Sequence, residues 1–291
     1  MSLRPSATAT SQDDVLPGGF ADRDLQFTQS DFARICVLIY QRAGIVLAEH
    51  KKEMVYGRLG RRVRHHGLTR FADYLARLES NPANPEWQAF TNALTTNLTS
   101  FFREAHHFPL LASHVAGRRG PLRVWSAAAS TGEEPYSIAM TLIEQLGAHA
   151  DITVVATDID TDALARARDG IYPLEQVARL DPTRRKRFFQ RGSGRRAGYA
   201  RIRPEVAARV RFAPLNLIES RWTLDGPPFD AIFCRNVMIY FDKETQARIL
   251  ARFAPLLKPD GLLFAGHSES FSYTSDRFAL RGQTVYTLAK R

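Results

Sequence analysis

Cysteine and long apolar runs are both scarce in this sequence. Only Cys36 and Cys234 occur among its 291 residues. Two cysteines are too few for a disulfide framework, and they predict free thiols in a reducing compartment. No run of ~20 apolar residues is present, which argues against a membrane-spanning helix. No apolar segment follows a charged start at the N-terminus, so no signal peptide is expected. These absences together predict a cytoplasmic protein.

Metal-binding and hydrolase motifs are also missing. The histidines include the adjacent pairs at 65–66 and 106–107, a spacing that does not suit metal ligation, and no cysteine or carboxylate cluster accompanies them. No G-x-S-x-G nucleophile motif occurs. We therefore expect neither a metal site nor a serine hydrolase.

Basic residues outnumber acidic ones, giving a net charge of +10. This balance predicts an acidic partner, which leaves nucleic acid, an anionic membrane surface and an acidic protein open. With 44% hydrophobic and 24% charged residues, the composition is that of a globular protein with a sizeable core.

The hydrophobic pattern predicts two domains in series. Residues 1–25 are rich in Ser, Thr, Asp, Gly and Pro and predict a disordered tail. Residues 26–93 show helical periodicity. In the segment 31–44, Ser30 or Asp31 can serve as N-cap, and one face gathers Phe32, Ile35, Leu38, Ile39 and Tyr40. Residues 94–119 form a linker to a second domain, 120–291.

Strands and helices alternate in the second domain. Strands are predicted near 121–130, 151–160, 229–241 and 261–268, with helices between them, which favours a mostly parallel sheet covered on both faces. A last strand near 284–290 follows without a helix, so it is expected to be antiparallel. Residues 258–261 (KPDG) predict a turn.

One stretch interrupts this alternation. Residues from about 172 to 213 contain short β-like pieces around Gly192, Gly194 and Gly198. They predict a small antiparallel insertion whose exposed strand edge can accept an extended peptide.

The loop after the first predicted strand lacks a phosphate-binding motif. Residues 126–134 contain one glycine, Gly132, followed by Glu133 and Glu134, whereas a dinucleotide site needs G-x-G-x-x-G. The loop therefore argues against NAD or ATP. It suits an adenosine cofactor without phosphates, whose cationic sulfonium tolerates nearby carboxylates.

Two further strand ends carry polar side chains. Asp158 ends the second predicted strand at a position that fits ribose-hydroxyl binding; the alternative is a helix cap or a solvated turn. Arg235, Asn236 and Tyr240 follow a strongly apolar strand, as active-site residues often do. The alternative is that Asn236 caps a helix and Tyr240 packs in the core.

A basic helix is predicted in the first domain. Residues 51–64 contain six basic residues against the single acidic Glu53. Lys51, Lys52, Arg58 and Arg62 can share one stripe, while Met54, Leu59 and Val63 can face inward. The stripe is either a docking surface for an acidic partner or a solvated face.

Four sequence blocks carry a family resemblance: WSAAASTGEEPYSIAM, ATDID, FDAIFCRNVMIYFD and LLKPDGLLFAGHSE. They resemble the signature blocks of the CheR family of chemotaxis receptor methyltransferases. The resemblance extends through AGIVLAEHKKEMVYGRLGRRVR and ALTTNLTSFFREAHHF and covers the chain from about residue 27 onward. It implies an α/β fold: a class I S-adenosylmethionine (SAM) methyltransferase Rossmann-like sheet with a small antiparallel β insertion, preceded by an all-α N-terminal domain.

The resemblance also implies an activity and a site. Methyl would pass from SAM to glutamate carboxylates of chemotaxis receptors, leaving S-adenosylhomocysteine. Cofactor contacts would be Asn97, Thr99, Arg103, Glu134, Asp158, Asn216, Leu217, Arg235 and Asn236. Arg103 and Tyr240 would lie near the transferred methyl, and Asp158 would hold the ribose.

Partners follow from the same resemblance. The basic residues Lys51, Lys52, Arg58, Arg61 and Arg62 would face acidic cytoplasmic helices of the receptors, and the insertion would bind a receptor C-terminal pentapeptide. Neither nucleic acid nor membrane insertion is expected.

A glutamate carboxylate, with a reference pKa of about 4.3, is already a nucleophile at neutral pH. No general base is then needed, and catalysis reduces to positioning and charge control. Two other functions stay open on the residues alone. A nucleic-acid methyltransferase is favoured by net charge but lacks an Asn-Pro-Pro-aromatic motif. The other is a non-catalytic adaptor that senses SAM.

Overall fold

The computed structural model describes residues 24–271 and 275–289. The predicted tail lies outside this range, except for Asp24 and Leu25. Leu25 is buried in the core of the helical part. Within the described ranges no helix combines the length and apolarity needed to cross a bilayer.

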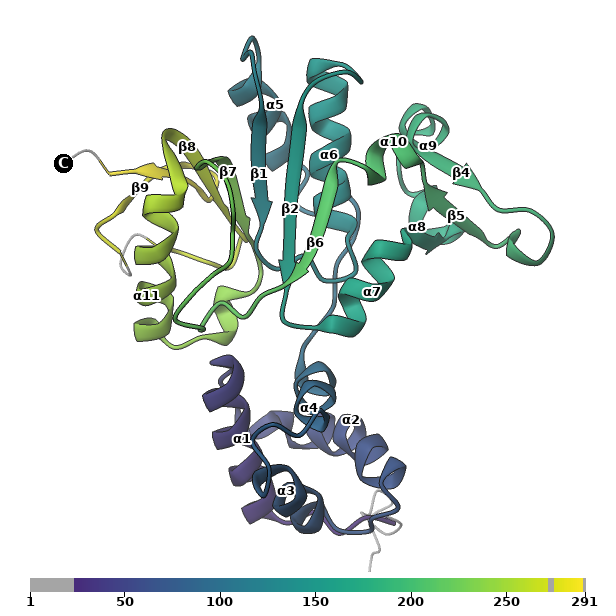
Figure 1. Cartoon of the computed structure of the whole chain (residues 1–291), viewed down its shortest axis with the longest axis vertical. Coiled ribbons are helices and arrows are strands. Elements are labelled where there is room, and N and C mark those ends of the chain that lie inside the picture. Colours follow the sequence, from purple (N-terminus) through teal and green to yellow (C-terminus); the bar gives the residue numbers. More distant parts are fainter. Residues whose placement is uncertain (1–23, 272–274, 290–291) are drawn as a thin grey trace, which may run out of the picture.

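The N-terminal part is a helical bundle, which Figure 1 shows below the sheet. Its elements are α1 (Gln29–Ala43), the 3-10 helix η1 (Glu49–Lys51), α2 (Lys52–His65), α3 (Phe71–Glu79) and α4 (Glu86–Leu94). Their apolar faces enclose one core, in which Ile35, Leu59 and Phe71 are fully buried.

The N-cap of helix α1 lies two or three residues earlier than the sequence suggests. Its N-cap is Thr28, whose hydroxyl accepts from Asp31 N at 3.1 Å, while the Asp31 carboxylate accepts from Thr28 N at 2.9 Å. This reciprocal capping box satisfies backbone donors at both residues, so the prediction of Ser30 or Asp31 as the cap was wrong. The grouping of Tyr40 with the buried face was also wrong, because its side chain is 43% exposed and donates to Asp242 Oδ2 at 2.6 Å.

A seven-stranded sheet with the order β6-β2-β1-β7-β8-β10-β9 forms the second part. Its strands are β1 (Leu122–Ser126), β2 (Ile152–Asp158), β6 (Val210–Pro214), β7 (Phe229–Cys234), β8 (Leu257–Ala265), β9 (Phe278–Gly282) and β10 (Val285–Leu288). The first five strands in that order are parallel to one another, and β10 runs antiparallel to both β8 and β9. The predicted antiparallel C-terminal strand is thus confirmed, while β9 was missed.

Helices cover both faces of this sheet, which explains the continuous apolar strands. Helices α5 (His107–Val115) and α6 (Glu133–Leu146) pack on one face, where they share a core with Ala231 and Phe233 of β7. Helix α11 (Lys243–Phe253) packs on the other face with Ile232 and Cys234. Alternate residues of β7 therefore enter opposite cores, as the two-residue strand period requires.

Residues 258–261 are part of β8, so the prediction of a turn between helix and strand was wrong. Phe229 of β7 pairs with Leu257, but Ala231 pairs with Leu262. The extra residues of β8 are absorbed as an irregularity in the ladder, which lets a turn-like sequence remain within a strand.

The predicted insertion is a three-stranded antiparallel sheet in the order β3-β5-β4. It consists of β3 (Ile171–Pro173), β4 (Phe189–Arg191) and β5 (Tyr199–Ile202), with α8 (Leu174–Ala178), α9 (Pro182–Phe188) and η2 (Gly194–Arg196) between them. In Figure 1 it projects from the side of the main sheet, beyond α7 (Thr161–Asp169). Its strands end at Ile202, and α10 (Pro204–Ala207) leads from there to β6. The predicted span to about 213 was therefore too long, because β6 belongs to the main sheet.

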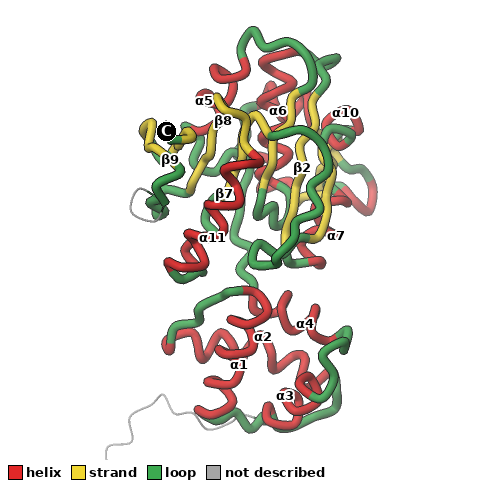
Figure 2. The backbone as a smooth tube through the Cα atoms, turned by 60° about the vertical axis from the view of Figure 1, so that its left-hand side comes forward, coloured by secondary structure: helices red, strands yellow, loops and turns green. Residues whose placement is uncertain are grey.

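Taken together, these elements confirm the predicted fold class: an all-α N-terminal part, a Rossmann-like sheet and a small antiparallel insertion. Figure 2 shows the helical part as a separate layer against one end of the sheet.

Candidate functional site

A pocket of about 410 Å³ lies between the helical part and the carboxyl ends of the parallel strands. Three parts of the chain line it: residues 43–54 of the helical part, residues 94–103 of the connecting segment, and the loops after β1, β2, β6 and β7. Open α/β sheets bind ligands at this edge. The pocket is therefore the candidate site.

The loop after β1 is held by a buried carboxylate. Ser130 N donates to Asp158 Oδ2 at 2.7 Å, and Asp160 N donates to Asp158 Oδ1 at 2.9 Å. Ser130 and Gly132 both have positive φ, +48° and +98°. A Cβ at Gly132 would lie 2.8 Å from Tyr172 Oη, so this turn requires glycine. Burial raises the pKa of Asp158 to about 6.

The cap of α7 is Asp160, which accepts from Asp162 N and Ala163 N. The alternative of a helix cap therefore applies to Asp160, and the carboxylate of Asp158 lies on the pocket wall.

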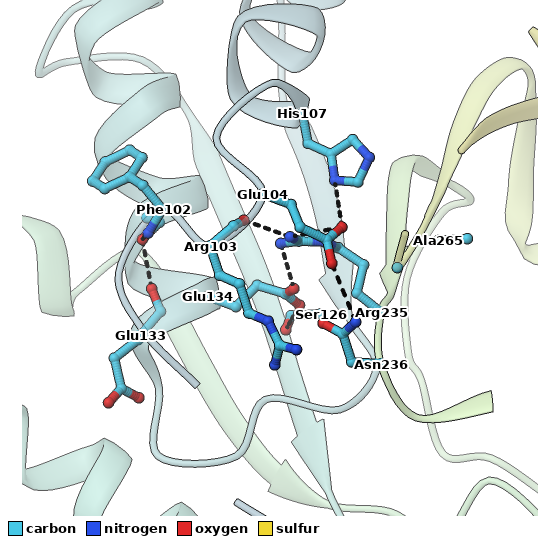
Figure 3. A network of polar contacts seen from close by, with 12 residues as sticks. Phe102, Arg103, Glu104, His107, Ser126, Glu133, Glu134, Arg235, Asn236 and Ala265 are labelled. Carbon is cyan, nitrogen blue, oxygen red and sulfur yellow. Dashed lines mark hydrogen bonds and ion pairs between the residues drawn. The ribbon is translucent and has the colours of Figure 1, made fainter. Parts of the chain in front are cut away.

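A buried ion pair joins the segments that follow β1 and β7. Arg235 Nη1 lies 3.0 Å from Glu134 Oε2, and the Arg235 side chain is only 2% exposed. Ser126 Oγ donates to the other Glu134 oxygen at 2.7 Å. Burial raises the pKa of Glu134, and the charge of Arg235 opposes that shift. The pair places a fixed cation and anion at the end of the sheet (Figure 3).

The connecting segment is tied to the strand ends by side chains. Thr95 Oγ1 and Asn97 Nδ2 each donate to Asp160 Oδ2 at 2.6 Å, and Ser130 Oγ donates to Asn97 Oδ1 at 3.0 Å. Arg103 Nη1 donates to Leu98 O at 2.8 Å. These contacts bring the connecting segment onto the loops after β1 and β2.

The helical part reaches the same pocket through main-chain contacts. Asn216 Nδ2 donates to Arg42 O at 2.7 Å, and Val46 N donates to Tyr240 O at 2.8 Å. Gly44 allows this approach: its φ is +70°, and a Cβ there would lie 2.7 Å from the side chain of Ile218. The two parts of the chain therefore close one pocket together.

All ten residues predicted for the cofactor and the transferred methyl line this one pocket: Asn97, Thr99, Arg103, Glu134, Asp158, Asn216, Leu217, Arg235, Asn236 and Tyr240. Asn236 does not cap a helix, because Val237 precedes η3 (Met238–Tyr240) and Asp242 caps α11. Tyr240 packs partly against the core of the helical part. Met54, expected to face inward, also lies on the pocket wall, whereas Leu59 and Val63 are fully buried.

Two glutamates of the site were missed from sequence. Glu269, 5% exposed, accepts from the backbone N–H groups of Gly266, Asn236, Val237 and Met238. It shapes the loop that carries Asn236, whose φ is +58°. Glu104 contacts both Arg235 and Asn236. Both glutamates follow irregular segments, where no hydrophobic period marks them.

The basic residues predicted to face the receptor fall into two groups, those bonded within the protein and those that are exposed. Arg62 donates to both oxygens of Glu86, Arg58 donates to Thr95 O, and Lys52 donates to Gln29 at 2.6 Å. Lys51 and Arg61 are exposed, and Lys51 also lines the pocket. Arg62 therefore supports the fold of the helical part, and Arg58 ties that part to the connecting segment.

Among residues 24–271 and 275–289, no group of three or more His, Cys, Asp or Glu side chains could hold a metal ion. The donor set fits a cationic adenosine cofactor, because it offers the carboxylates of Glu134 and Asp158 beside apolar walls.

Comparison with known proteins agrees with this site. Residues 30–95 match the all-alpha domain of CheR methyltransferases, and residues 97–287 match their SAM-binding domain. The chain is 61% identical over 282 residues to the chemotaxis protein methyltransferase of Escherichia coli (strain K12), covering 94% of this chain and 98% of that protein. Identity to the protein of the same name from Salmonella typhimurium (strain LT2) is 60% over 282 residues, with the same coverage. Chemotaxis protein methyltransferase 2 of Pseudomonas aeruginosa is 52% identical over 274 residues, 93% of this chain and 97% of that protein. The chain therefore belongs to the CheR methyltransferase family, and its second part is a SAM-binding domain.

Proposed function

We propose that this protein transfers the methyl group of SAM to glutamate side-chain carboxylates of chemotaxis receptors, forming methyl esters and leaving S-adenosylhomocysteine. The observation that carries the proposal is one pocket that unites the predicted cofactor residues with Arg103 and Tyr240. Relatives at 60% identity or above are named chemotaxis protein methyltransferases.

The cofactor roles follow from the chemistry of the wall. Asp158 would accept from the ribose hydroxyls, and Glu134 and Arg235 would face the charged methionine end. Asn97, Thr99, Asn216, Leu217 and Asn236 would complete the enclosure. SAM supplies a methyl group on a cationic sulfur, so the electrophile needs no metal.

The protein's part in transfer is orientation. The acceptor carboxylate is ionised at neutral pH, so no proton has to be removed before attack. Arg103 uses one nitrogen to hold Leu98 O and has further N–H groups to direct at an acceptor carboxylate. Tyr240 presents a hydroxyl on the same pocket wall. Both would fix the acceptor in line with the methyl and stabilise charge as it is neutralised.

We propose that the basic residues Lys51, Lys52, Arg58, Arg61 and Arg62 serve receptor docking in two ways. Lys51 and Arg61 are exposed and would meet acidic side chains of the receptor helices directly. Lys52, Arg58 and Arg62 are half-buried and would add their positive field while holding the helical part together.

The insertion is suited to an acidic peptide. Residues 171–203 contain ten Lys or Arg and two Asp or Glu, a net charge of +8. Seven of these cations are exposed: Arg179, Lys186, Arg187, Arg191, Arg195, Arg196 and Arg201. Among the described strands, β4 pairs only with β5, which leaves one edge for strand addition by a receptor C-terminal pentapeptide.

The test is the chemical stability of the product. The protein is incubated with methyl-labelled SAM and receptor-enriched membranes, and the labelled receptor band is treated with mild base. Esters hydrolyse under these conditions, whereas methylated amines and bases do not, so release as volatile methanol is expected. Base-stable label on the receptor, or label found in nucleic acid, would contradict the proposal.

A further inference from the structure

Glu104 directly follows Arg103 but points away from the pocket. Phe102 and Glu104 both have positive φ, +53° and +54°, so the chain turns sharply on either side of Arg103. The Glu104 side chain is 10% exposed and is not among the residues that line the pocket. Backbone strain at the two residues that flank Arg103 persists only where surrounding contacts determine it. The contacts of the Glu104 side chain therefore indicate what this turn positions.

The two oxygens of Glu104 hold residues from two different strand ends. Oε1 accepts from Asn236 Nδ2 at 3.1 Å and lies 3.0 Å from His267 Nδ1. Oε2 lies 3.3 Å from Arg235 Nη2. Burial alone would raise the pKa of Glu104, but the hydrogen bond from His267 and the charge of Arg235 lower it to about 2. The carboxylate is therefore ionised at neutral pH.

Arg235 has a carboxylate partner at each of its two Nη atoms. Its Nη1 meets Glu134, while its Nη2 meets Glu104 and donates to the carbonyl of Arg103. Figure 3 shows the guanidinium between the two carboxylates, with Asn236 bonded to the other oxygen of Glu104. Glu104 lies outside the pocket and thus contacts two residues of its wall, Arg235 and Asn236. Arg235 in turn holds the main-chain carbonyl of Arg103.

We propose that Glu104 is a positioning residue for the SAM site, acting through Arg235 and Asn236. This inference rests on the cofactor roles proposed above. The Arg235 guanidinium lies between two carboxylates, Glu134 on the pocket wall and Glu104 behind it. The charge of Glu104 therefore makes the surroundings of the pocket more negative than Glu134 and Arg235 alone would. The sulfur of SAM is cationic, and that of S-adenosylhomocysteine is neutral. Glu104 therefore contributes to holding Arg235 and Asn236 for both ligands, and its charge favours SAM over the product.

The substitution Glu104→Gln separates the positioning of Arg235 and Asn236 from the effect of the Glu104 charge. Gln can keep an oxygen for Asn236 and His267, but it removes the charge and turns its N–H groups toward Arg235. Affinity for SAM should fall at least about tenfold, and affinity for S-adenosylhomocysteine by about threefold. Glu104→Asp keeps the charge but shortens the reach, so both affinities should fall by a similar factor.

Isothermal titration of each purified variant with SAM and with S-adenosylhomocysteine measures both affinities, and thermal unfolding in parallel reports the fold. Glu144→Gln is the matched control, because Glu144 is ion-paired with Arg184 at 2.8 Å and does not line the pocket. It should leave both affinities within about twofold.

Wild-type affinities in folded Glu104→Gln would overturn the inference. An equal loss for both ligands in Glu104→Gln would also overturn it, because the charge of Glu104 would then not favour SAM over the product. Should Glu104→Gln not fold, unchanged affinities in Glu104→Asp would overturn it. Because binding is measured without a methyl acceptor, this outcome does not depend on whether glutamate is the substrate.

Discussion

Arg62 and Arg61 are adjacent cations on α2 with different surroundings, so substituting each in turn separates fold support from docking. Arg62 donates from Nε and Nη2 to the two oxygens of Glu86, at 2.8 and 2.5 Å. The Glu86 side chain is 9% exposed, and Tyr74 also donates to it. Arg61 is exposed. We expect Arg62→Ala to destabilise the protein and Arg61→Ala to leave its stability unchanged.

The magnitude follows from what Arg62→Ala leaves behind. A nearly buried carboxylate would lose two charge-assisted donors while keeping Tyr74 and His66. Such a loss costs about 2 to 3 kcal/mol in the free energy of unfolding. At Arg61 only an exposed side chain is removed, and the change should stay within about 0.5 kcal/mol.

The pH dependence gives a second signature. Burial of Glu86 opposes ionisation, but hydrogen bonds from Arg62, His66 and Tyr74 outweigh it and lower its pKa to about 2. A lowered folded-state pKa stabilises the protein above the unfolded value of about 4.3, and that stability is lost as pH falls toward 2. Arg62→Ala should therefore lose less stability than the wild type between about pH 5 and pH 2.

Urea unfolding at neutral pH, and thermal unfolding across this acidic range, measure both effects. Receptor methylation is then assayed at a temperature where every variant is folded. Arg61→Ala should raise the receptor concentration needed for half-maximal rate. Equal stability of the two variants, or an unchanged acid profile in Arg62→Ala, would refute the assignment of Arg62 to the fold.

Three further substitutions test the pocket. Arg103→Ala should reduce turnover at least about 100-fold with an unchanged circular dichroism spectrum. Near-normal turnover would contradict the proposed role of Arg103 in orienting the acceptor. Gly132→Ala should lower the free energy of unfolding by about 2 to 4 kcal/mol in urea titration, because φ is +98° and the new Cβ would lie 2.9 Å from Ala167 Cβ. Its control is Gly117→Ala, where φ is +73° but nothing lies within 4 Å; an equal loss there would refute the packing argument. Burial raises the pKa of Asp158 to about 6, so affinity for SAM should increase as pH rises through 6 and the ionised form appears. Asp158→Asn should abolish that rise in a titration series, and a retained rise would argue against ribose binding by Asp158.

Sequence patterns were sufficient for the fold and for the cofactor class. The continuous apolar run of β7 and the single glycine before Glu133 are local features that the sequence shows directly. The burial of Tyr40 was harder to predict, because a helical period places residues on one face of a helix but does not show which part of the chain covers that face. Tyr40 meets Asp242, which lies 202 positions further along the chain.

The same limit explains the missed carboxylates. Glu269 and Glu104 act by accepting hydrogen bonds from loops that come together only in the folded chain. No spacing rule connects residue 104 with residues 235 and 267. The basic stripe shows the converse: its spacing was visible, but the partner Glu86 that bonds Arg62 lies in another helix.

The most direct test of the central claim is to locate the transferred methyl on the acceptor. A receptor cytoplasmic fragment is incubated with this protein and SAM, and its peptides are sequenced by tandem mass spectrometry under acidic conditions that preserve esters. The account predicts methyl groups on glutamate side chains, absent when Arg103→Ala replaces the wild type. Methyl groups on lysine, arginine or the fragment's N-terminus, with glutamates unmodified, would contradict it.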